Sequence, residues 1–172
     1  TFIPTAAAVV SWSIVEGLIR GKASGLGAAS GMVAGLVAVT PACGTSGPIG
    51  ALFLGLAVSP ICYFFVSTVK SKFGYDDSLD VFGVHGIGGI VGAIGTGILV
   101  APSLGGTGGE DFVMASQVWI QIKAVLLTIV WSGIGSFVIL YITKIITGIR
   151  AAEEDEREGL DLASHGESAY HS

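Results

Sequence analysis

Residues 80–100 read Asp80-Val-Phe-Gly-Val-His85-Gly-Ile-Gly-Gly-Ile-Val-Gly-Ala-Ile-Gly-Thr-Gly-Ile-Leu-Val100. After Asp80 the stretch is apolar over about 20 residues, the length that a helix needs to cross the hydrocarbon core of a bilayer. Only His85 within it is ionisable near neutral pH. Because such a side chain is costly at membrane depth, it usually faces a cavity or a polar partner rather than lipid. The stretch predicts a spanning helix whose histidine faces a pore or a proton-handling site.

The composition of the 172 residues is that of a membrane protein, with 51% hydrophobic residues, 12% charged residues and a mean hydropathy of +0.78. Soluble domains carry roughly 25% charged residues. The chain has no basic stripe, and its sequence pI near 5.0 argues against nucleic-acid binding. Cys43 and Cys62 follow no metal or disulfide spacing. We therefore expect no metal, no cofactor and no nucleic-acid partner.

Apolar stretches predict an all-α, polytopic membrane helix bundle over residues 1–147, followed by a polar tail at 148–172. The fifth stretch is longer than a bilayer requires, so its helix should tilt, bend or project beyond the membrane. The second is short, and its Gly27, Gly31 and Gly35 recur on one helix face, which is typical of close helix packing. The alternative for the second stretch is a glycine-rich loop. The five predicted spans are residues 2–19, 24–39, 48–69, 81–100 and 118–146.

Basic residues alternate between the connections. Arg20 and Lys22 follow the first span and Lys70 and Lys72 follow the third, whereas residues 40–47 and 101–117 contain no Lys or Arg. Lys123, just inside the fifth span, is the exception. Because Lys and Arg favour the cytoplasmic side, the first span should begin outside and the tail should end inside. The tail itself, residues 150–172, is acidic and is either a solvated end or a docking segment.

The sequence predicts roles for two residues near the start of the fourth span. Asp80 precedes the helix and should act as its N-cap by accepting backbone N–H bonds. Val81 lies one turn before His85, and Gly88, Gly89 and Gly92 follow on the same helix face. This face can pack against another helix or leave room for a small molecule. The alternative role for His85 is structural, as a hydrogen-bond partner of a neighbouring helix.

An enzyme is not expected. Neither a Walker loop nor an HExxH motif is present. Ser30 and Ser132 are conceivable nucleophiles, but their spacing ties neither of them to His85, and both fit better as small packing residues.

Three motifs resemble the bacterial ammonium transporters of the Amt/Mep type, and the similarity covers essentially the whole chain. They are Thr40-Pro-Ala-Cys-Gly, Asp80-Val-Phe-Gly-Val-His-Gly, and the tail pair Glu156-Arg-Glu-Gly-Leu-Asp and His165-Gly-Glu-Ser-Ala-Tyr. The resemblance implies an eleven-span subunit of a homotrimer, with the present spans as the seventh to eleventh. The chain is accordingly expected to be the C-terminal half of a transporter of the cell inner membrane.

The resemblance also implies a function. Ammonium or ammonia would cross a hydrophobic pore in each subunit, lined by His85, Val81 and Phe82 and by a first histidine that this chain does not contain. Both NH3 passage and net NH4+ transport remain open, as does an ammonium sensor of the same fold. The resemblance further places a PII-type signal protein, and hence nitrogen regulation, at the cytoplasmic tail. The tail residues concerned are Arg150, Glu156, Gly159, Asp161, His165, Gly166 and Tyr170.

Overall fold

The computed structural model describes residues 1–168, and within them all regular secondary structure is helical. Tyr170 therefore lies outside the described residues. Four helices are long and apolar enough to cross a membrane, and α2 is a shorter apolar helix of 15 residues. Each predicted span thus corresponds to a helix, and the all-α fold class is confirmed. The α-helices are α1 (Phe2–Arg20), α2 (Gly25–Val39), α3 (Pro48–Phe64), α4 (Lys70–Phe73), α5 (Ile87–Leu99), α6 (Met114–Ile146) and α7 (Glu153–Glu158).

Contacts divide the chain into two compact units, residues 1–127 and 128–172. The boundary falls inside α6, whereas the predicted division between membrane bundle and tail lies at residues 147 and 148. That division rests on polarity rather than on contacts, and it stays a prediction. At 33 residues α6 is about 50 Å long, well beyond the roughly 30 Å of a bilayer core.

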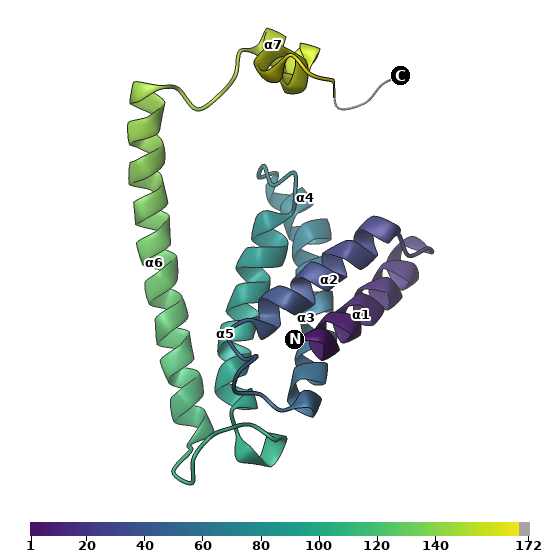
Figure 1. The fold of residues 1–172 in the computed structure, drawn as a ribbon, viewed down its shortest axis with the longest axis vertical. Helices are drawn as coiled ribbons and strands as arrows, with labels where there is room; N and C mark the ends of the chain where they lie inside the picture. The colour runs from purple at the N-terminus through teal and green to yellow at the C-terminus, as the bar shows by residue number, and fades with distance from the viewer. Residues whose placement is uncertain (169–172) are drawn as a thin grey trace. The chain divides into compact units, whose positions relative to one another are not determined.

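The first unit packs α1, α2, α3 and α5 together, and Figure 1 shows α1 beside α2 as an antiparallel pair. Trp12 of α1 belongs to the core of this unit. The centre of its ring lies 5.5 Å from the centre of the Tyr63 ring, in an edge-on arrangement. Both side chains are almost fully buried. The remaining core is made largely of small residues, with Ala8, Ala34, Ala38, Val58 and Cys62 each fully buried.

Glycines on one face of α2 allow it to approach α1 closely. A Cβ atom added at Gly31 would collide with Trp12, and one at Gly35 would collide with the backbone of Pro4. At Gly27 it would collide with the carboxylate of Glu16. The predicted packing face is confirmed, and the alternative of a glycine-rich loop is wrong because these contacts need a regular helix with a four-residue repeat.

Two π-helical turns lie next to each other in the first unit. The turn η1 (Phe65–Val69) continues α3 into α4, and η2 (Phe82–Gly86) leads into α5. Gly83 of η2 lies against Val66 of η1, where an added Cβ would collide with the valine side chain. Such turns shift side chains relative to a regular α-helix and are frequent at functional sites.

The connections between helices meet in two groups. The uncharged residues 40–47 contact the connection after α5, where the Thr107 amide donates to the Thr45 carbonyl at 3.0 Å. Arg20, at the basic end of α1, lies over the ring of Tyr63 in α3, 5.9 Å from its centre. The basic connections that follow α1 and α3 therefore lie at one end of the bundle, and the two connections without Lys or Arg lie at the other. This separation agrees with the alternation of basic residues in the sequence, and which end faces the cytoplasm stays a prediction.

Candidate functional site

His85 lies on η2, on the side of the helix that the bundle does not cover. Gly83 and Val84 of the same turn are buried, whereas His85, Val81 and Phe82 are exposed. Val81 retains 52% and Phe82 49% of their accessible surface. The structure thus brings the three predicted pore residues together on one open, largely apolar face.

Nothing among residues 1–168 hydrogen-bonds the His85 imidazole. If His85 were a structural residue, its imidazole would bond to a neighbouring helix, and the described residues offer no such partner. The helix is anchored instead by the residues around the histidine.

The glycines that follow His85 serve mainly for helix packing. A Cβ atom added at Gly92 would collide with the backbone of Ala38 in α2, and one at Gly88 would touch Val37 and Cys62. Gly89 has open space. The sequence left two possibilities for this face, and close packing holds for Gly88 and Gly92, whereas the space beside Gly89 is open.

Two aromatic rings pack against Phe82, one from η1 and one from the connection that leads into η2. Its ring centre lies 6.4 Å from that of Phe65 and 5.7 Å from that of Tyr75, both in edge-on geometry. Edge-on pairs at these distances are favourable because the positive rim of one ring meets the negative face of the other. The half-exposed Phe82 is thereby held in one orientation beside His85.

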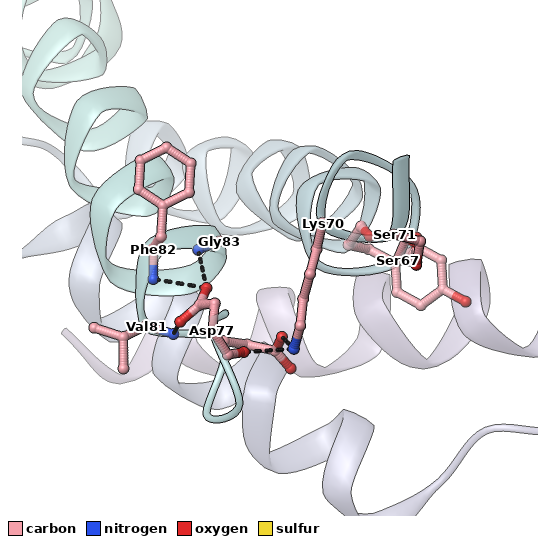
Figure 2. A network of polar contacts seen from close by, with 9 residues as sticks. Ser67, Lys70, Ser71, Asp77, Val81, Phe82 and Gly83 are labelled. Atoms are coloured by element: carbon pink, nitrogen blue, oxygen red, sulfur yellow. Dashed lines mark hydrogen bonds and ion pairs between the residues drawn. The ribbon is translucent and has the colours of Figure 1, made fainter. Parts of the chain in front are cut away.

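Asp77 caps the helix that carries His85. Its carboxylate accepts hydrogen bonds from the amides of Val81 at 2.7 Å, Phe82 at 3.0 Å and Gly83 at 3.3 Å. Figure 2 shows this carboxylate turned toward the first turn of the helix. The bonds satisfy N–H groups that have no partner within the helix, and the negative charge lies at the positive end of the helix dipole.

The cap predicted for Asp80 is therefore made by Asp77. Asp80 has φ 55°, the only positive φ of a non-glycine residue among those described, whereas an N-cap residue has an extended backbone. The Asp80 carboxylate instead accepts a hydrogen bond from Lys70 Nζ at 2.8 Å. Lys70 also donates to the backbone carbonyl of Asp77. Sequence reasoning missed Asp77 and Lys70 because both act through the folded connection and not through helical spacing.

A polar hollow of about 340 Å³ lies at the basic end of the bundle, between α1, α2 and α4. Buried Glu16 lines it and accepts hydrogen bonds from the Ser24 amide at 3.0 Å and the Ser24 hydroxyl at 2.9 Å. Arg20 is 3.9 Å from the same carboxylate, as the spacing of the two residues predicted. The hydroxyl of Tyr63 is buried without a hydrogen-bond partner among the described residues.

The tail residues belong to the second unit, where Arg150 and Glu156 form a two-point ion pair. Nε and Nη2 of the arginine each lie 2.9 Å from a carboxylate oxygen. The hydrogen bond from Arg150 lowers the pKa of Glu156 from its usual 4.5. Gly159 and Gly166 have φ of 110° and 67°, a region that favours glycine, and they bracket the π-helical turn Asp161–His165. Most of the predicted tail residues thus share one short folded segment.

Within residues 1–168, no group of three or more His, Cys, Asp or Glu side chains is arranged to hold a metal ion. The Ser30 hydroxyl donates to the Leu26 carbonyl of its own helix at 3.1 Å, as a packing residue does.

Comparison with known proteins identifies the family. The model of the Ammonium Transporter Family matches residues 1–170. An ammonium transporter of Aquifex aeolicus is 49% identical over 170 residues, which are 99% of this chain and 40% of that protein. Another, from Bacillus subtilis, is 44% identical over 96% of this chain and 41% of its own length. The chain thus spans about two fifths of the length of these relatives.

A solved structure described as a sensor Amt protein superposes with a TM-score of 0.80 at 28% identity, covering 94% of this chain and 40% of that one. Its fold is the arrangement of apolar helices that the present chain adopts. Because the family model matches residues 1–170 and a relative is 49% identical over 99% of this chain, the chain belongs to the ammonium transporter family.

Proposed function

We propose that this chain supplies one side of a pore through which ammonium or ammonia crosses the membrane, with His85, Val81 and Phe82 lining it. The observation that carries the proposal is the open face of η2, where an imidazole stands between apolar side chains and outside the core of its own bundle. Because the chain covers about two fifths of its relatives, the opposite wall is assigned to segments that this chain does not contain.

The chemistry of such a face favours ammonia over other ions. A bare cation in an apolar passage costs many kcal/mol, but ammonium can give up a proton and enter as neutral ammonia. A neutral imidazole can hydrogen-bond ammonia through either ring nitrogen and can relay a proton. Potassium has no proton to lose, so the same face excludes it. The role is binding and passage rather than catalysis.

The proposal extends to the assembly and its regulation. Tail residues Arg150–Ser168 would lie on the cytoplasmic side, because the basic connections gather at one end of the bundle. We place the whole transporter in the cell inner membrane as a homotrimer, with a PII-type signal protein docking at the tail. Deleting residues 150–172 should change transport or abolish PII binding. Unchanged flux together with unchanged PII binding would contradict a regulatory tail.

An ammonium sensor with little flux is the second candidate function. It is favoured by the TM-score of 0.80 to the structure described as a sensor Amt protein. A sensor would bind ammonium at the same face without passing it at a useful rate.

The test is ammonium flux in liposomes, using the longest natural protein that contains these residues. We expect flux well above that of empty liposomes, and a large loss on His85→Ala with the protein still correctly folded. Saturable ammonium binding without flux would favour the sensor. Undiminished flux in the alanine variant would contradict a histidine-lined pore.

A further inference from the structure

The connection between α4 and η2 is a short, tightly bonded turn. Gly74, with φ 63°, ends α4, and the amide of Asp80 donates to the carbonyl of Asp77 at 3.1 Å. Residues 77–80 therefore form a closed turn immediately before the helix that carries His85. The left-handed backbone of Asp80 costs free energy that the surroundings must offset.

Lys70 joins both ends of this turn. Its Nζ donates to the backbone carbonyl of Asp77 at one end and to the carboxylate of Asp80, at 2.8 Å, at the other. The lysine side chain is 27% exposed and that of the aspartate 34% exposed, so the pair is partly shielded from solvent. Figure 2 shows Lys70 reaching from its helix to the turn. Because an ammonium group has three donors, one lysine can hold both acceptors together.

Residues 77–80 also fix the orientation of the first turn of the helix that carries His85. The carboxylate of Asp77 accepts from the amides of Val81, Phe82 and Gly83. His85 follows two residues after the last of these amides and shares the π-helical turn of Phe82 and Gly83. A rotation of residues 77–80 would therefore rotate the helix start and move the imidazole.

We propose that Lys70 is a positioning residue for His85, acting through Asp77 and Asp80. The inference rests on the proposed function of His85 and adds to it a residue that lies on a different helix. An ordinary surface ion pair contributes little and can be removed without consequence. Lys70 differs because it holds a strained aspartate and the residue that caps the histidine's helix.

Lys72 provides a matched control. It has the same charge, lies on the same short helix, is exposed, and makes no hydrogen bond or ion pair with any residue between 1 and 168. A role that depends on net positive charge at this end of the protein would involve both lysines equally. A positioning role involves Lys70 alone.

The experiment measures ammonium flux, its pH profile and its inhibition by potassium in liposomes, again with the longest natural protein that contains these residues. The variants are Lys70→Gln, Lys70→Arg, Lys72→Gln, His85→Ala and the double variant Lys70→Gln/His85→Ala. We expect Lys70→Gln to lower flux several-fold, shift the pH profile and weaken potassium exclusion. Lys70→Arg should restore most of the flux, and Lys72→Gln should behave as wild type. In the His85→Ala background, Lys70→Gln should add no further change.

Three results are decisive. If Lys70→Gln keeps wild-type flux and selectivity while His85→Ala is defective, the positioning inference is overturned and the pore proposal stands. Equal fractional losses from Lys70→Gln with and without His85 would also overturn it, since they indicate a general structural role. A His85→Ala protein with wild-type flux overturns the pore proposal and the inference with it. If Lys70→Gln does not fold, Asp80→Asn replaces it with the same expectations, because asparagine tolerates a positive φ but lacks the charge.

Discussion

Gly92 of α5 lies against the backbone of Ala38 in α2, so closely that a single added carbon atom would collide with the alanine carbonyl. Gly89, one turn earlier in the same helix, has no atom within 4 Å of the position where its Cβ would stand. Two glycines of the same helix therefore have different structural roles, and only Gly92 is needed for the close approach of α5 to α2.

Gly92→Ala should destabilise the protein by about 1–3 kcal/mol, because the two helices must separate to admit the methyl group. Gly89→Ala is the control and should be neutral or stabilising by up to about 1 kcal/mol through helix propensity. Thermal unfolding of the two purified variants in detergent measures the difference. Equal midpoints would show that the close approach of α5 to α2 carries no free energy.

Glu16→Ala should destabilise the first unit by about 1–3 kcal/mol, because two hydrogen bonds from Ser24 to the buried carboxylate are lost. Arg20→Ala removes an exposed partner 3.9 Å away and should cost about 1 kcal/mol or less. The measurement is the unfolding midpoint of each variant. A larger loss from Arg20→Ala than from Glu16→Ala would mean that the ion pair, and not the serine, holds the α1–α2 connection.

The tail should respond to acid through Glu156. Its pKa is lowered in the folded tail by the hydrogen bond from Arg150, so the ion pair contributes stability above the usual value of 4.5 and loses it as the pH falls through the lower folded pKa. Carboxyl 13C NMR titration of Glu156 should show this lowered pKa. Arg150→Gln should return it toward 4.5, and an unaltered titration in that variant would rule out the arginine as the cause.

His85→Asp should weaken the exclusion of potassium. A carboxylate can hold a bare cation that a neutral imidazole does not attract, and its hydration lowers the cost of admitting an intact ion. The expected result is more charge moved per nitrogen, or new potassium permeation, with the fold retained. Potassium competition and current in liposomes check it. Ammonium transport with full potassium exclusion would instead assign selectivity to other residues.

The spans could be predicted because a membrane helix is encoded locally. A run of about 20 apolar residues has few other stable structures, and the repeat of Gly27, Gly31 and Gly35 defines a packing face by helix geometry alone. The placement of Val81, Phe82 and His85 on one face also follows from helical spacing. Their exposure, by contrast, depends on which helices pack against the opposite face, where Gly83 and Val84 are buried.

The error at Asp80 shows where local reasoning ends. Its position just before the helix suits an N-cap, but a backbone φ of 55° directs the side chain toward Lys70. Asp77, four to six residues before the amides that it binds, reaches them because the intervening residues fold into a turn. No periodicity in the sequence marks that turn or the lysine that holds it.

Hydrophobicity and helical period are properties of neighbouring residues, so the membrane character, the helical class, the spans and the alternation of basic connections could be predicted from the sequence alone. It also carried the motifs by which the chain resembles its family. Which aspartate caps the helix of His85, which glycines are packed, and which groups Lys70 and Glu16 bind became clear only from the folded chain. Hydrogen-bond partners and close contacts depend on segments far apart in the chain meeting at atomic distances, and a local pattern does not contain those distances.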